Sequence, residues 1–223
     1  MTDYIKNEVV NYLNDTYKQE FKNSNGYFAV EGADVINFVY DSILSKSNYV
    51  LNWIKIEFGI RNATTPNEKQ NINTYLDEVF GVSSNIQVNV LSPLRTFWEK
   101  ATLIHVECHR NRLHDSPERL SRHWYDLYKL CQSKVIDQAL TANDIFQDVL
   151  TVKKAFYNAN YANYDDCSIG KFRLIPHQIG LHRLQSDYEK MINAGFFFKT
   201  PPSFDEIINS LSQLEQKINN RFA

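Results

Sequence analysis

Hydrophobic and polar positions follow two different periods along the chain, and the change between them lies near residue 92. Apolar residues recur at helical spacing over Thr2–Phe21, which predicts an N-terminal helix. The next two segments, Val35–Asp41 and Tyr49–Ile60, show the two-residue period of half-buried strands. We expect a short helix over Ile72–Val79 and a further strand over Ile86–Val90. The first part of the chain therefore contains both helix and sheet.

After Ser92-Pro93 only the helical period remains, so a domain boundary is predicted here. The polar stretch Asn62–Gln70, which contains Pro66, is predicted to be a loop. Five helices are expected beyond the boundary: Arg95–Arg110, Arg119–Gln132, Ala142–Tyr157, Leu181–Asn193 and Ser203–Phe222. The pattern predicts an α+β protein, with a sheet-containing domain over residues 1–92 and a helical bundle over residues 93–223.

The composition narrows the class of protein. The chain has 223 residues, of which 43% are hydrophobic and 22% charged, as in ordinary globular proteins. A formal net charge of -2 argues against a strong overall attraction to nucleic acid. Three widely spaced cysteines form a poor disulfide framework and fit a reducing compartment. No apolar run approaches the roughly 20 residues of a membrane helix, and the N-terminus lacks a signal-peptide core. We expect a cytoplasmic protein that is not in the membrane.

Candidate chemistry gathers on two of the predicted helices. Arg119, Arg122, His123 and Asp126 recur at helical spacing and share one face. Such a face can bind phosphate and move protons, or it can be a salt-bridged structural network, which is the more common case. Lys100 lies at the edge of an apolar stripe and could reach a cleft, but spacing alone favours a solvated lysine.

Two other groups of residues suggest metal chemistry less strongly. His105, Cys108 and His109 share a helix with His114 close by, but HVECH is not the HExxH zinc motif and no second cysteine pair could complete a site. Asp165 and Asp166 are adjacent, so their side chains would diverge on a strand. We expect neither group to bind a metal ion.

Two motifs, RTFWEK at 95–100 and RLSRHWYDLYKL at 119–130, together resemble the paired signature of the AbiEii/AbiGii nucleotidyltransferase toxins. These are toxins of type IV toxin–antitoxin and abortive-infection systems. WIKIEFGIR at 53–61 is similar to the carboxylate-bearing strand of that family, and residues 184–219 resemble its C-terminal helices. The order of the motifs matches over nearly the whole chain.

The resemblance implies a DNA polymerase β-like enzyme that uses magnesium to transfer a nucleotide from a nucleoside triphosphate to an RNA acceptor such as tRNA. A cognate antitoxin is the implied partner. Lys100 matches the active-site lysine, and Asp126 matches an aspartate that acts as a base or orients the acceptor. Glu57 falls where these folds carry an additional metal carboxylate. Phosphate contacts are implied for other side chains of the two motifs: Arg95, Arg119, Arg122 and His123.

The front half of the family pattern, a glycine-rich turn and an Asp-x-Asp strand, has no equivalent in this sequence. We therefore expect residues 1–92 to be a remnant of the nucleotidyltransferase α/β domain, truncated or split before the metal motif. Such a chain would be inactive alone and would use Mg²⁺ only if another chain supplied the missing half. The alternatives are a non-catalytic module that binds nucleotide, RNA or a partner, and a purely structural domain. An open sheet edge would favour self-association or burial by a partner along Val35–Ile60.

Overall fold

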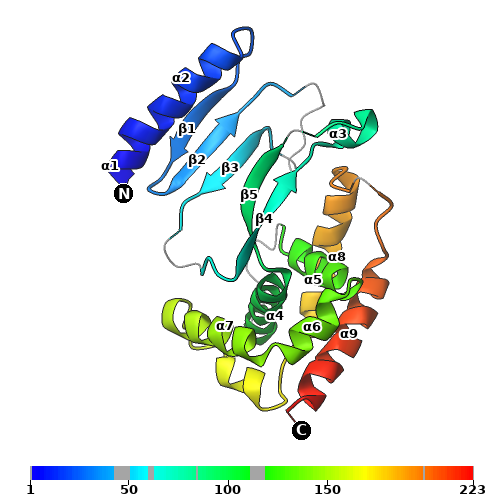
Figure 1. Cartoon of the computed structure of the whole chain (residues 1–223). Helices are drawn as coiled ribbons and strands as arrows, with labels where there is room; N and C mark the ends of the chain where they lie inside the picture. The colour runs from blue at the N-terminus through cyan, green and yellow to red at the C-terminus, as the bar shows by residue number, and fades with distance from the viewer. Residues whose placement is uncertain are drawn as a thin grey trace. The chain divides into compact units, whose positions relative to one another are not determined.

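The computed structural model describes residues 2–42, 51–59, 63–83, 85–110, 119–197 and 199–222. The α+β class is confirmed, because helices are combined with small antiparallel sheets (Figure 1). The chain divides into two compact units. Unit 1 is Met1–Asn62 with Lys190–Lys199, and unit 2 is Ala63–Glu189 with Thr200–Ala223. The domain boundary near Ser92-Pro93 stays a prediction.

Unit 1 combines an N-terminal helical segment with a three-stranded antiparallel sheet. The predicted helix is present as three consecutive pieces: α1 (Thr2–Tyr4), the π-helix η1 (Ile5–Val9) and α2 (Val10–Glu20). The sheet has the order β1-β2-β3, with β1 at Tyr27–Glu31, β2 at Val35–Val39 and β3 at Trp53–Glu57. Both predicted strands are therefore confirmed at their centres, and β1 is an addition to the prediction. Residues 49, 50 and 60 of the second predicted strand lie outside the described part of the chain.

The register of this sheet gathers its apolar residues on one face. Ile36 of β2 lies opposite Val30 of β1 and Ile56 of β3, and it is fully buried. Ile5 and Val10 of the helical segment pack in the same core cluster. Because directly paired residues of neighbouring strands point to the same face, Val30 and Ile56 also pack against this cluster.

Unit 2 begins with a two-stranded antiparallel arm. β4 (Asn67–Ile72) pairs with β5 (Ile86–Leu91), and α3 (Tyr75–Phe80) connects them. The loop predicted over Asn62–Gln70 is thus wrong from Asn67 onward. All six residues of β4 are exposed, so the strand has no apolar alternation to reveal it. Pairing with β5 holds it in place instead.

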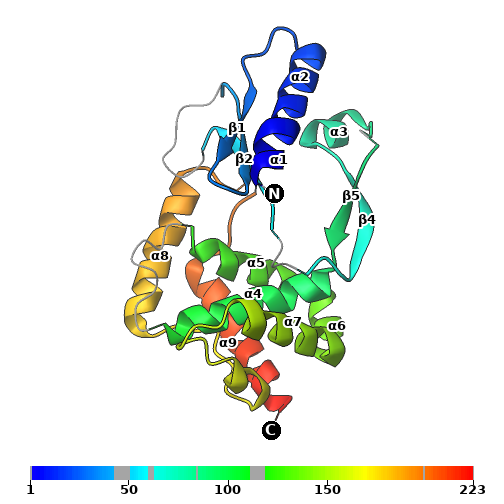
Figure 2. The ribbon, with the colours of Figure 1, turned by 90° about the vertical axis from the view of Figure 1, so that its left-hand side faces the viewer.

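In the helical part of unit 2, α4 runs through the centre and packs against α5, α6, α7 and η2 (Figures 1 and 2). All five predicted helices are present, whereas α6 and the 3-10 helix η2 were not predicted. The helices are α4 (Pro93–His109), α5 (Ser121–Cys131), α6 (Val135–Thr141), α7 (Asn143–Phe156), η2 (Tyr164–Ser168), α8 (Gln178–Asn193) and α9 (Phe204–Asn220). Among the described residues, no helix combines the length and the apolar character needed to cross a bilayer.

Two tryptophans fix the core of unit 2 by both packing and hydrogen bonding. Trp98 of α4 is fully buried, and its Nε1 donates to the carbonyl oxygen of Ala139 in α6 at 3.0 Å. Trp124 of α5 donates to the carbonyl oxygen of Leu174 at 2.9 Å. Each buried indole N–H therefore has an acceptor, which avoids the cost of an unsatisfied donor. The expected apolar stripe of α4 is buried at Phe97, Ala101, Ile104 and Cys108.

His105, one of the residues that suggested zinc, belongs to this core. Its Nδ1 accepts the backbone N–H of Arg173 at 3.0 Å, so its Nε2 carries the proton that meets the carbonyl oxygen of Asn163 at 3.1 Å. Burial lowers the pKa of His105 to about 4 and keeps the imidazole neutral. No group of three or more potential ligands that could hold a metal ion occurs in the described ranges, and His114 lies outside them.

The neutral state of His105 makes the stability of unit 2 depend on pH. The unfolded chain, with an ordinary histidine pKa near 6.5, takes up a proton before the folded chain does as the pH falls. We expect the resulting stabilisation, about 3 kcal/mol, to be present above pH 6.5 and to be lost as the pH falls towards 4. Urea unfolding between pH 7.5 and pH 4 measures this loss.

His105→Asn should remove the His105 contribution and so reduce this pH dependence, because the asparagine does not titrate. Val149→Ala, a core change at a residue that is 1% exposed, should lower stability equally at every pH and serves as the control. An unchanged pH dependence in His105→Asn would contradict the assignment.

Candidate functional site

Helix α4 presents Lys100 at the edge of the buried core. The helix begins at Pro93, where the missing N–H costs nothing, and Ser92 Oγ caps it by accepting the N–H of Leu94 at 3.3 Å. The side chain of Lys100 is 25% exposed, so most of it is covered while part of it reaches solvent.

The tip of Lys100 meets two side chains of α5. Its Nζ donates to Asp126 Oδ2 at 2.7 Å and lies 3.1 Å from His123 Nδ1. The Asp126 side chain is 43% exposed, so the group is open to solvent. The structure thus brings together three of the residues singled out in the sequence, although Lys100 and Asp126 are 26 positions apart. We refer to them as the Lys100 cluster: Lys100, His123 and Asp126.

The environment of His123 fixes its protonation state. Partial burial lowers its pKa to about 4, and the positive charges of Lys100 and Arg122 act in the same direction, while Asp126 opposes them. The imidazole is therefore neutral near pH 7. Since the ammonium of Lys100 has only donors, His123 Nδ1 is the acceptor and Nε2 carries the hydrogen. The neutral imidazole of His123 and the carboxylate of Asp126 thus both accept a hydrogen bond from the ammonium of Lys100.

The two arginines of the predicted face differ in their surroundings. Arg122 is exposed and makes no hydrogen bond or ion pair within the part of the chain that the structure describes. Arg119 is half-buried and adopts a left-handed backbone conformation, with φ 67°, immediately before α5 begins. Arg122 leaves its guanidinium available to an anion near the Lys100 cluster.

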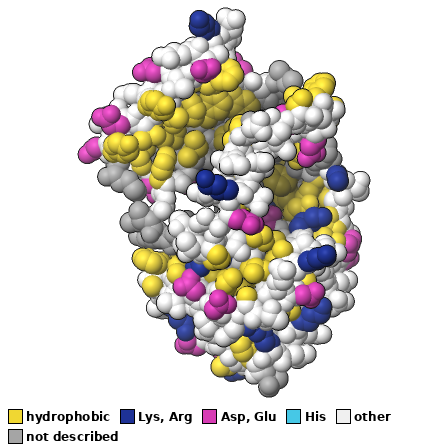
Figure 3. Space-filling model, in the orientation of Figure 1, with side chains coloured by type: hydrophobic (Ala, Val, Ile, Leu, Met, Phe, Trp, Pro, Cys, Tyr) yellow, Lys and Arg dark blue, Asp and Glu magenta, His cyan; other side chains and the backbone are white. Residues whose placement is uncertain are grey.

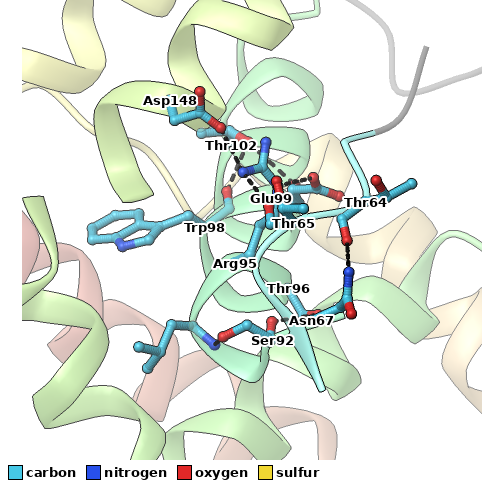
Figure 4. Close-up of polar contacts among 11 residues, drawn as sticks. Thr64, Thr65, Asn67, Ser92, Arg95, Thr96, Trp98, Glu99, Thr102 and Asp148 are labelled. Carbon is cyan, nitrogen blue, oxygen red and sulfur yellow. Dashed lines mark hydrogen bonds and ion pairs between the residues drawn. The ribbon is translucent and has the colours of Figure 1, made fainter. Parts of the chain in front are cut away.

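Arg95, the first residue of the RTFWEK motif, points into the structure rather than to solvent (Figure 4). Its Nη1 donates to Asp148 Oδ2 of α7 at 2.5 Å and to the carbonyl oxygen of Thr65 at 2.9 Å. Its Nε donates to Glu99 at 3.2 Å. The side chain is 2% exposed. These contacts join the start of the β4–β5 arm, α4 and α7, and share no residue with the Lys100 cluster.

Glu57, the candidate metal carboxylate, lies on β3 in unit 1. Its side chain is 67% exposed and pairs with Lys55 at 2.7 Å. The hydrogen bond that Lys55 donates to Glu57 raises the pKa of Lys55. Throughout the described ranges, no three His, Cys, Asp or Glu side chains gather as metal ligands would. The described residues therefore do not fit the two-carboxylate magnesium site of a nucleotidyltransferase.

The chemistry open to the Lys100 cluster follows from its geometry. An ammonium at the surface can neutralise phosphate oxygens, and a carboxylate beside it can orient a hydroxyl or accept its proton. Salt-bridged networks use the same residues, but both partners here remain partly exposed. The arrangement can therefore combine neutralisation of a negative charge with acceptance of a proton.

Comparison with known proteins identifies the family of this chain. The sequence profile described as nucleotidyl transferase AbiEii toxin, type IV TA system, matches residues 1–210. The chain belongs to this AbiEii family. A nucleotidyltransferase-like toxin function follows, with a nucleotide substrate and an antitoxin partner in general terms. No curated protein and no solved structure matches the chain.

The contacts of His123 predict opposite effects of its two neighbours. Lys100→Met removes a positive charge and should raise the pKa of His123 above about 4, though not to 6.5, because burial remains the largest cause. Asp126→Asn removes the negative charge and should lower that pKa further. Imidazole NMR titration, assigned with His123→Gln, measures both. Shifts of the same sign in the two variants would show that the cluster is not formed in solution.

Proposed function

We propose that this chain carries the lysine–aspartate half of a nucleotidyltransferase site, which acts in transfer of a nucleotide from a nucleoside triphosphate to an RNA acceptor such as tRNA. The observation that supports the proposal best is the contact of Lys100 Nζ with Asp126 at 2.7 Å in a partly exposed position. They are the two residues to which the resemblance gives active-site roles. We propose that the site acts on RNA in the cytoplasm.

In the proposed reaction, the acceptor hydroxyl attacks the α-phosphorus of the triphosphate. A new oxygen–phosphorus bond forms, the bond to pyrophosphate breaks, and the hydroxyl proton passes to Asp126. Lys100 exchanges its contact with Asp126 for triphosphate oxygens, which frees that carboxylate to orient the hydroxyl. His123 stays neutral and holds the ammonium of Lys100 in position through Nδ1. The lysine charge then opposes the negative charge that builds up in transfer.

The three arginines of the two motifs that the proposal involves have different roles. Arg122 is exposed beside the Lys100 cluster and supplies a guanidinium for phosphate. Arg119 stands at the start of the same helix and adds positive charge there. A phosphate contact by Arg95 would require it to release Asp148, Glu99 or Thr65. We therefore propose that Arg95 supports the site mainly by holding the N-terminal end of α4.

The proposed reaction needs carboxylates that hold Mg²⁺. The sequence contains no Asp-x-Asp pair, and Glu57 is committed to Lys55. We propose that the carboxylates which hold Mg²⁺ lie outside this sequence, and that this chain by itself does not catalyse transfer. The competing proposal, a non-catalytic module that binds nucleotide or RNA, predicts triphosphate binding without transfer even when the missing half is supplied.

Labelling of RNA with a radioactive nucleoside triphosphate and Mg²⁺ tests the function. We expect label in tRNA only when a polypeptide bearing the glycine-rich turn and Asp-x-Asp strand is added. Lys100→Ala should then reduce transfer by roughly 100-fold or more, since it removes a charge that acts on the transition state. Lys129→Ala changes an exposed lysine of α5 and should leave transfer intact.

Each outcome separates one part of the proposal. Transfer by this chain alone would overturn the external metal site but not the role of Lys100. Equal transfer by Lys100→Ala and the unmodified protein would overturn the role of Lys100. Triphosphate binding without transfer in the complete mixture would favour the binding module.

A partner surface on unit 1 completes the proposal. In the described part of the sheet, β3 has a hydrogen-bonded neighbour only on the β2 side. Trp53 and Ile54 of β3 are 39% and 58% exposed, and hydrophobic side chains gather on this unit (Figure 3). An open edge next to exposed apolar side chains favours pairing with another strand. We propose that two copies of this chain associate through β3.

Ile54→Lys should weaken that association, because it places a charge on the pairing strand. Sedimentation at several protein concentrations should show dimer for the unmodified chain and monomer for Ile54→Lys. Val79→Lys, at another exposed apolar residue on α3, is the matched control and should remain dimeric. A monomeric unmodified chain at all concentrations would contradict the proposal.

A further inference from the structure

Helix α5, which carries most of the candidate site, has no cap of its own. Its N-cap residue is Leu120, whose side chain cannot accept a hydrogen bond and makes no cap contact. The preceding residue, Arg119, has φ 67°, a conformation that few residues other than glycine adopt. The first N–H groups of α5 would lack partners if only neighbouring residues were available.

The missing cap comes from a different helix. Asp187 of α8 accepts the backbone N–H of Arg119 through Oδ1 at 2.8 Å. Its Oδ2 accepts the backbone N–H of Ser121 at 2.8 Å and the Oγ–H of Ser121 at 2.5 Å. Asp187 is 2% exposed and Ser121 is 1% exposed. A carboxylate is thus buried against the positive end of the α5 dipole, 66 residues away along the chain.

The burial of Asp187 has an electrostatic explanation in these contacts. A buried carboxylate is costly unless hydrogen bonds or a cation compensate it. Within the described ranges, Asp187 forms no ion pair, and its three hydrogen bonds all go to the start of α5. The side chain is therefore committed to that helix end, where charge-assisted hydrogen bonds are strongest.

The capped turn leads directly to the Lys100 cluster. The backbone N–H of His123 donates to the carbonyl oxygen of Leu120 at 3.0 Å, which ties His123 to the same turn. Asp126 follows within the next turn. If the first turn frays, the distances from Lys100 Nζ, 3.1 Å to His123 and 2.7 Å to Asp126, are not maintained.

We infer that Asp187 is a positioning residue, which caps α5 from α8 and so holds His123 and Asp126 against Lys100. Its importance for nucleotide transfer rests on the proposed function, whereas its effect on the geometry of the cluster does not. Sequence spacing cannot reveal this residue, because Asp187 lies in another motif on another helix.

Asp187→Asn tests the inference with little change in size. The amide keeps one acceptor oxygen but turns an NH₂ group towards an N–H donor of α5, so at least one cap bond is lost. We expect the first turn to fray and His123 to gain water and lose its contact with Lys100. Its pKa should rise from about 4 by about one unit or more, because both main causes of the lowered value weaken. Imidazole NMR titration measures this shift.

Two further variants keep the test decisive. Leu150→Ala removes core volume in α7, at a residue that is 3% exposed, and leaves the cap intact. It should destabilise the fold without moving the His123 pKa. Ser121→Ala removes only the hydroxyl contact and should raise the pKa by less than Asp187→Asn does. This variant still tests the cap if Asp187→Asn does not fold.

The outcomes distinguish positioning from function. A His123 pKa that stays near 4 in both Asp187→Asn and Ser121→Ala would overturn the inference, whatever happens to transfer. An equal rise in Leu150→Ala would also overturn it, since general destabilisation would then suffice. A rise confined to the cap variants supports positioning, even if Lys100→Ala leaves RNA labelling unchanged and the proposed function fails.

Discussion

Burial of α4 is the constraint on which the rest of unit 2 depends. Its apolar stripe is inaccessible to solvent, and α5, α6, α7 and η2 all pack against it. A helix surrounded in this way can expose few residues, so any charged group on it must either be paired inside or reach the surface. Of the two cationic residues of the RTFWEK motif, Arg95 is paired inside and Lys100 reaches the surface. They therefore differ in their surroundings although they lie in one short segment.

The chemistry of the two side chains suits these two positions. The planar guanidinium of Arg95 offers several donors in fixed directions, which suits a buried position with Asp148, Glu99 and a carbonyl oxygen around it. A buried arginine of this kind contributes specificity of arrangement more than net stability, because desolvation offsets most of the attraction. Lys100, a flexible point charge, keeps access to solvent beside Asp126. The motif thus contains one charge that is buried in ion pairs, that of Arg95, and one that solvent can reach, that of Lys100.

Much of this architecture could be predicted from residue patterns, and the exceptions have a common cause. The helical period located α4 and α5, because each buries a regular apolar stripe. β4 was missed because its polar residues carry no period and the strand exists only through pairing with β5. Side-chain spacing placed His123 and Asp126 on one face, and the motifs added Lys100. Neither spacing nor motif could identify Asp187 as the cap of α5, since that contact spans 66 residues.

The same contacts do more than neutralise the charges of the Lys100 cluster, because they also preorganise it. An isolated lysine–aspartate pair on a surface is worth little, since water screens it and both side chains lose freedom. Here α4 is buried and α5 is capped by Asp187, so less additional entropy is lost when the pair forms. In the proposed reaction, a phosphate that displaces Asp126 from Lys100 leaves behind a carboxylate whose helix is already held in place. We therefore propose that preorganisation of both helices, rather than the strength of the ion pair, suits this surface to a nucleotide.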